Sequence, residues 1–409
     1  MKKIYILITA IAIFNITKAQ TEDSVNMNAG YAMDVFYSLD NGTVQTVANS
    51  EWTVALSTGS QTSAVYINDG KGVELYSTSL TPATFTNTLD TAGITTWSKI
   101  YNEYNDWEHS AFESGATGHP NYGWGNYNSV SHIVVGDKVF LLKTLAGTYY
   151  KASVLKKESG AWHYRYATLD NSFDTTIVYQ ASDLNDRNFA YLNMDNHLIS
   201  NREPSNTSWD MLFTKYYDID ESYNLTGVLL NIGVEVVEVD GVSPAAATYV
   251  GGTFDSNTKI IGADWKTFDM ATFSYLIDED RTYFVKQLDG DIYKVNFTRF
   301  DGSSTGKTVL NKEKIVSSAI KNIDAINSLS LYPNPAKNTA NLVIDTKESA
   351  EISYAIYNLV GKKLESNTTN LNAGLNAITL NVANYTQGIY LVQVKNGSQT
   401  QTIKLNVIK

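Results

Sequence analysis

The sequence predicts an all-β protein of several domains. Tyrosine is abundant, with 27 residues against only 6 prolines, and aromatic residues make up 12% of the chain. Together with many threonine, valine and isoleucine residues, they favour the pleated, half-buried surface of a β-sheet. The chain has 409 residues, 43% of them hydrophobic and 18% charged, which suits two or three packed domains and excludes general disorder. We expect two β-rich modules followed by a small antiparallel β-sandwich.

Charge and cysteine content exclude several classes of function. The chain carries 31 Lys and Arg against 42 Asp and Glu, for a formal charge of −11. Nucleic acid is therefore not an expected partner, because phosphate binding needs a basic face. The sequence contains no cysteine, which excludes disulfides, thiolate zinc sites, iron–sulfur clusters and cysteine nucleophiles.

The first 19 residues have the composition of a secretory signal peptide. Lys2 and Lys3 precede the apolar run Ile4–Phe14, and Thr17-Lys18-Ala19 places small residues at the −3 and −1 positions. We expect cleavage after Ala19. The alternative, a membrane anchor, needs an apolar run of about 20 residues, and this one is shorter. No other stretch is long enough, so we expect a secreted protein without a transmembrane span.

The body of the chain contains an internal repeat, with one β-rich module at residues 20–172 and a second at 173–320. Each copy opens with a hairpin, continues with a tryptophan-led strand and central strands, and closes with a hairpin that ends in Tyr-Lys. The shared landmarks, copy one before copy two, are Trp52 and Trp209, Asp106-Trp107 and Asp264-Trp265, Tyr150-Lys151 and Tyr293-Lys294.

The repeated tryptophans are predicted to pack in hydrophobic cores. A tryptophan followed by alternating apolar residues is typical of a strand that lays one face on a core. Stacking on a planar or sugar ligand remains open only where the ring has an accessible face.

Residues 321–327 read as a polar linker, and residues 328–409 as a separate module. Short alternating strands bounded by turns favour a small antiparallel sandwich. Pro333 and Pro335 flank Asn334 and prevent a helix at the start of this module.

The module at 328–409 closely resembles the type A C-terminal sorting domain of the type IX secretion system of Bacteroidetes, over about a fifth of the chain. The matching residues include Pro333, Asn334 and Pro335, Gly361 in the segment Tyr357–Gly361, Gly388 and Tyr390 in the segment Gln387–Leu391, and Lys404 in the segment Thr402–Leu405. The resemblance implies the outer-membrane export machinery of that system as a partner. It also implies a final location outside the cell or on its surface, after removal of the sorting domain.

The body resembles the HmuY-like family. In copy two the resemblance covers Phe189-Ala190-Tyr191, Ser208–Tyr217, Leu225–Val234, Ile292–Phe300 and Gly306, and in copy one it covers Trp52–Asn68 and Gly147–Leu155. The resemblance implies a largely antiparallel β body and, from the founding members, haem binding. Between Trp209 and Tyr293, copy two contains no histidine, so no ligand residue is carried over from the family.

Copy one contains the candidate ligand site. The segment 106–132 combines histidines with aromatic and glycine residues. His119 and His132 are candidate iron ligands, and Tyr122, Trp124 and Tyr127 are candidates to frame a flat ligand. Two alternatives stay open, namely a solvated loop with packed aromatic rings and a site for a sugar.

No motif in the sequence indicates an enzyme. The segment Gly302–Thr308 has three residues between its glycines where a phosphate loop has four. The acidic stretches Asp218–Glu221 and Asp278–Asp280 lack a full set of calcium ligands. The predicted function is an exported binding protein with haem as candidate ligand, the alternative being surface adhesion or carbohydrate binding. An unrecognised hydrolase would need acidic residues that converge in a cleft.

Overall fold

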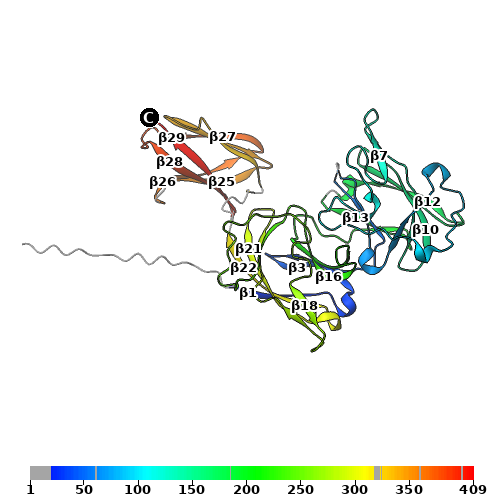
Figure 1. Cartoon of the computed structure of the whole chain (residues 1–409). Helices are drawn as coiled ribbons and strands as arrows, with labels where there is room; N and C mark the ends of the chain where they lie inside the picture. Colours follow the sequence, from blue (N-terminus) through cyan, green and yellow to red (C-terminus); the bar gives the residue numbers. More distant parts are fainter. Residues whose placement is uncertain are drawn as a thin grey trace, which may run out of the picture. The chain divides into compact units, whose positions relative to one another are not determined.

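The computed structural model describes residues 20–59, 62–184, 186–316, 323, 325–358, 361–397 and 399–409 (Figure 1). The predicted signal peptide at 1–19, most of the predicted linker, and Leu359 and Val360 lie outside the described residues. The chain divides into two compact units, residues 1–315 and 316–409. The all-β prediction is confirmed, since every helix among the described residues is a 3-10 turn of three or four residues.

The first unit, the body, contains two lobes. We call one the terminal lobe, because it combines both ends of the body sequence. Its five-stranded sheet has the order β1 (Thr21–Asn26), β22 (Lys307–Val316), β21 (Ile292–Phe300), β20 (Thr282–Lys286) and β17 (Glu235–Val239). Its four-stranded sheet has the order β16 (Tyr223–Leu230), β15 (Met211–Asp218), β2 (Met33–Ser38) and β3 (Gly42–Ala48). The separate hairpin is β18 (Lys266–Asp269) and β19 (Ser274–Ile277).

The second lobe, the central lobe, comes from the middle of the body sequence. The strands of its larger sheet have the order β12 (Asp174–Gln180), β11 (Ala161–Thr168), β10 (Tyr149–Glu158), β8 (Ile133–Gly136) and β7 (Gly125–Asn128). From β10 the pairing also continues to β9 (Phe140–Lys143) and β6 (Glu74–Ser77). The smaller sheet has the order β14 (Leu198–Ser200), β13 (Phe189–Asn193), β4 (Val54–Ser57) and β5 (Val65–Ile67).

The two halves of the body sequence share one strand plan. The first half, β1 to β11, and the second, β12 to β22, each start with a strand and a hairpin. Each then continues with a tryptophan-led strand, its neighbour, and the strands of the larger sheet. The sheet orders correspond, because β3-β2-β15-β16 matches β14-β13-β4-β5 and β1-β22-β21-β20-β17 matches β12-β11-β10-β9-β6. The first two strands of each half therefore pair with later strands of the other half, and the third strand pairs with the second.

Strand register supports this correspondence. Tyr37 on β2 pairs with Met211, two residues after Trp209, and Leu192 on β13 pairs with Val54, two residues after Trp52. The rings repeat the pattern. Phe36 meets Trp209 edge-on at 5.1 Å between ring centroids, and Tyr191 meets Trp52 edge-on at 5.4 Å.

The exchange shows how the two predicted modules pack, which the sequence left open. The predicted boundary between residues 172 and 173 falls between β11 and β12, at the junction of the two halves. Residues 20–172 and 173–320 nevertheless share both four-stranded sheets. Hydrophobic alternation shows which face of a strand is buried but not which strand it pairs with, so the sequence pattern could not reveal the exchange.

The body is organised by the three largest hydrophobic clusters among its described residues. One fills the terminal lobe around Trp265, and one fills the central lobe around Trp124 and Trp162. The third contains the exchanged strands and the segments that they meet, including Phe36, Tyr191 and Trp209. Aromatic residues dominate this third cluster, and their edge-to-face contacts add to the area they bury.

The second unit is the small antiparallel sandwich that the sequence predicts. One sheet has the order β23 (Ile326–Tyr332), β24 (Thr339–Thr346) and β27 (Gly374–Asn381). The other has the order β26 (Lys363–Leu371), β25 (Ala350–Asn358), β28 (Gly388–Asn396) and β29 (Gln399–Val407). Its apolar cluster contains only residues of this unit. Strand β23 begins at Ile326, inside the predicted linker 321–327.

Candidate functional site

The sorting motif is fastened to the last strand of the chain. The Asn334 side chain donates from Nδ2 to the Lys404 carbonyl oxygen at 2.8 Å, and its Oδ1 accepts from the Asn406 amide at 2.8 Å. The neighbouring Ala336 amide donates to the Asn406 carbonyl oxygen at 2.8 Å. Pro333 and Pro335 are exposed on either side of Asn334. The proline segment and β29 therefore form one surface feature.

The other motif residues shape turns and strands of the sandwich. Gly361 has φ +80°, a backbone conformation that favours glycine, and its amide donates to the Asn358 carbonyl oxygen at 3.0 Å. Gly388 begins β28. Tyr390 is buried, and its hydroxyl donates to the Thr386 carbonyl oxygen at 2.8 Å. Lys404 is exposed on β29.

In the central lobe, four of the five predicted ligand residues line one cavity of about 630 Å³, namely His119, Tyr122, Tyr127 and His132. The Tyr127 hydroxyl lies 2.6 Å from His132 Nδ1, and the Tyr122 hydroxyl lies 3.4 Å from His119 Nδ1. The His119 and Tyr127 ring centroids are 5.0 Å apart. Strand β7 carries Tyr127, and the turn after it carries His132.

The fifth residue, Trp124, does not belong to this cavity. Its side chain is 0% exposed, its Nε1 donates to the Ser63 carbonyl oxygen at 2.9 Å, and its ring lies 5.7 Å from that of Trp162. The prediction that Trp124 frames a ligand is wrong, because the hydrophobic core encloses both faces of the ring. Sequence reasoning could not separate a tryptophan beside a glycine-rich loop from one beneath it.

Sequence reasoning missed Lys157 on β10, which also lines the cavity. Its ammonium group donates to the carbonyl oxygens of Gly59, at 2.9 Å, and Thr62. It lies 4.7 Å from the centroid of the Trp162 ring. Burial lowers the pKa of Lys157 to about 8. Nothing in a strand sequence marks such a lysine, because its lowered pKa results from its burial in the folded protein.

An adjoining depression of about 720 Å³ shares His119 and Tyr122 with this cavity and adds polar groups. In it, Glu113 accepts the Ser63 hydroxyl at 2.6 Å, and burial raises the pKa of the Glu113 carboxyl. His109 pairs with Asp106 at 2.8 Å, and the hydrogen bond that the imidazole donates to the Asp106 carboxylate raises the pKa of the imidazole.

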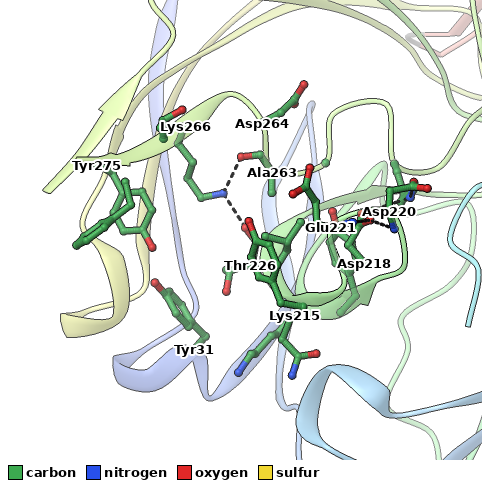
Figure 2. A pocket seen from close by; sticks show the side chains of 18 residues that line it. Tyr31, Lys215, Asp218, Asp220, Glu221, Thr226, Ala263, Asp264, Lys266 and Tyr275 are labelled. Atoms are coloured by element: carbon green, nitrogen blue, oxygen red, sulfur yellow. Dashed lines mark hydrogen bonds and ion pairs between the residues drawn. The ribbon is translucent and has the colours of Figure 1, made fainter. Parts of the chain in front are cut away.

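The terminal lobe contains a cavity of about 590 Å³ that sequence reasoning did not identify (Figure 2). Lys266, at the start of β18, donates to the carbonyl oxygens of Thr226 at 2.7 Å and Ala263 at 3.3 Å. Burial lowers the pKa of Lys266 to about 7. Elsewhere on the wall, Lys259 pairs with Asp218 at 3.3 Å and Asp220 at 2.9 Å.

One acidic cluster has the spacing of a metal site. Single carboxylate oxygens of Asp40, Asp289 and Asp291 lie within 4.8 Å of one another. The Lys314 ammonium group lies 2.6 Å from Asp40 and 2.7 Å from Asp291. Lysine therefore supplies the cation at this cluster, and we assign no metal to it.

Residues 330–409 match the family of secretion system C-terminal sorting domains. This part of the chain is a type IX sorting domain. The sorting domain indicates the type IX export machinery as its partner, and secretion or attachment at the cell surface as the outcome. No family match supports the resemblance of the body to the HmuY-like family.

None of the curated proteins that were compared matches the chain. Among solved structures, the crystal structure of dimeric latent PorU from Porphyromonas gingivalis is 11% identical, with a TM-score of 0.19. The match covers 68% of this chain and 32% of that one, so the chain spans about a third of the length of PorU. A likeness this low assigns neither fold nor function. Within the part of the chain that the structure describes, no helix is long and apolar enough to cross a membrane.

Proposed function

We propose that the body exported by the sorting domain is a binding protein rather than an enzyme, and that the central-lobe cavity is its ligand site. One observation carries the proposal. His119, Tyr122, Tyr127 and His132, which the sequence had singled out, line one cavity together with the buried cation of Lys157.

Haem is the first candidate ligand, and the residues present fit it. Imidazole and phenolate groups are both iron ligands in haem proteins, and His132 and Tyr127 are in hydrogen-bond contact at the cavity wall. Lys157 offers a cation that can pair with a carboxylate substituent of the ring. When bound, haem would supply the iron centre, and the protein residues would hold and orient it.

A carbohydrate is the second candidate, favoured by the adjoining depression. Glu103, Glu108 and Glu113 line it beside Tyr122. Carboxylates accept hydrogen bonds from sugar hydroxyl groups, and a tyrosine ring can stack on the sugar.

Haemin titration of the mature full-length chain, followed by absorbance in the Soret region, tests the first candidate. We expect saturable binding that a His119→Ala, His132→Ala double variant loses and a His163→Ala control retains, because His163 on β11 does not line the cavity. No Soret shift, or a shift equal in all three proteins, would remove haem from this site. A glycan array that compares the chain with its Tyr122→Ala variant tests the second candidate.

A further inference from the structure

The two cavities occupy equivalent places in the duplicated body. Val65 on β5 pairs with Leu56, and Val228 on β16 pairs with Phe213, at matching positions of the two four-stranded sheets. Two residues before each valine, Ser63 lines the central-lobe cavity and Thr226 lines the terminal-lobe cavity. The terminal-lobe cavity therefore lies where the other half of the repeat has its candidate ligand site.

Both cavities hold a lysine in the same kind of setting. Like Lys157, Lys266 donates to two backbone carbonyl oxygens and lies over a buried tryptophan, with Nζ 4.3 Å from the Trp265 ring centroid. None of the described carboxylates forms an ion pair with Lys266, since the nearby Asp264 pairs with Arg281 at 2.6 Å. A partly buried cation without a counter-ion is costly, and a ligand anion would compensate it.

Hydrogen-bond donors surround Lys266 at this end of the cavity. The Phe300 ring is the common support, because Lys266 Nζ lies 4.9 Å from its centroid, Tyr31 stacks on it at 5.9 Å and Tyr275 meets it edge-on at 4.7 Å. Burial, and then the neighbouring Tyr275, raise the pKa of Tyr31, so its hydroxyl group keeps its proton. Lys215 adds a further cation that no described carboxylate pairs with.

The opposite side of the cavity has three carboxylates, two of which, Asp218 and Asp220, also pair with the Lys259 ammonium group and leave the side acidic. Figure 2 shows Tyr31 and Tyr275 on one side, with Glu221, Asp218 and Asp220 on the other. The carboxylates can accept hydrogen bonds from hydroxyl groups. A ligand that satisfies both sides carries one anionic group and several hydroxyl groups. A neutral sugar would leave Lys266 uncompensated, and a single inorganic ion would not reach both sides of a cavity of about 590 Å³.

We propose that the terminal-lobe cavity is a second ligand site that binds a hydroxylated organic acid of the uronic acid type. The ligand carboxylate accepts from Lys266 and from the tyrosine hydroxyl groups, and the ligand hydroxyl groups donate to the acidic side. This assignment does not depend on what the central-lobe cavity binds.

Calorimetric titration of the mature chain at pH 6 with galacturonate, glucuronate, galactose and inorganic sulfate tests the assignment. We expect at least one uronate to bind, and to bind at least tenfold more tightly than galactose, because a charge-assisted hydrogen bond contributes about that much. Sulfate is expected to bind more weakly than the uronate. Equal affinity for galactose, equal affinity for sulfate, or no binding of either uronate would overturn the proposal.

Variants locate the bound acid. Lys266→Gln is expected to weaken uronate binding by about tenfold to a hundredfold, and Lys215→Gln by a smaller factor. A Lys307→Gln control, at a lysine of the same lobe that does not line the cavity, should leave it unchanged. The His119→Ala, His132→Ala variant should also bind the uronate normally, so the two proposed sites can fail separately. Undiminished binding in both Lys266→Gln and Lys215→Gln, with the fold verified by circular dichroism, would contradict the assignment.

Discussion

Asp69 is a carboxyl group enclosed in the body, with 2% of its surface exposed. One oxygen accepts from the Tyr104 hydroxyl at 2.9 Å, and the other accepts from the Asn102 amide at 3.0 Å. Burial nevertheless outweighs these hydrogen bonds and raises the pKa of Asp69 to about 7.

The raised pKa predicts a pH-dependent stability. The folded state keeps the Asp69 proton between about pH 4 and 7, where the unfolded chain loses it, so this group makes the protein less stable as pH rises through that window. In the Asp69→Asn variant, the fall in unfolding free energy as pH rises should be smaller by up to about 4 kcal/mol. Urea unfolding at pH 5 and pH 8 measures it. A variant with the same pH dependence as the wild type would contradict the buried, protonated carboxyl.

Trp124 and Tyr122 lie two residues apart and give opposite predictions. Trp124→Ala should cost roughly 3–5 kcal/mol of unfolding free energy, because it empties a fully buried volume. Tyr122→Ala, at a partly exposed cavity wall, should cost much less and instead weaken ligand binding. Denaturant unfolding measures the loss of stability in each variant. Equal losses in Trp124→Ala and Tyr122→Ala would contradict the placement of Trp124 in the core.

These residues show how far a sequence pattern reaches at this scale. The clustering of histidine and aromatic residues in one short segment was enough to single out His119, Tyr122, Tyr127 and His132, which line one cavity. They could not identify Lys157 or Lys266, because the backbone carbonyl groups that hold each ammonium group come from segments distant in the sequence.

At the scale of elements, hydrophobic alternation and turn residues predicted strands and hairpins correctly, including β2–β3 and β28–β29. Two of the repeat landmarks, Trp52 with Trp209 and Tyr150 with Tyr293, fell at matching points of the fold. The third pair did not, because Trp107 packs against the third cluster and Trp265 lies in the cluster of the terminal lobe. The sequence patterns could not predict the pairing between halves. Strand β2 pairs with β15, and β13 with β4, through apolar residues that would be buried equally if each half paired within itself. In a duplicated chain, equivalent elements can exchange places and still pair with an equivalent strand, so the cost of exchange is low.

The exchange predicts that the two halves hold together without a covalent link. A protease recognition sequence inserted after Asp170, in the exposed turn between β11 and β12, would separate β1–β11 from β12–β22. We expect the cut fragments to elute together in size-exclusion chromatography under native conditions and to separate in urea. Two folded fragments that elute apart would contradict the exchanged pairing.

At the scale of the whole molecule, the sorting unit has a hydrophobic core of its own. The family match identifies this unit as a sorting domain, and some of the motif residues form the surface feature made by the proline segment and β29. Asn334 is the residue through which the proline segment joins β29. Sequence motifs were sufficient here because the recognised features are local turns and a terminal strand, whereas the proposed ligand sites of the body are cavities assembled from distant segments.

Export of the body is the measurement that tests this account most directly. The body should be quantified by immunoblot in the periplasm, on the surface and in the medium of the native host, for the full chain, a chain ending at Val316 and an Asn334→Ala variant. The account predicts that the truncated body accumulates, folded, in the periplasm, and that Asn334→Ala reduces export while the signal peptide still functions. Truncated body outside the cell at the level of the full chain would contradict the account.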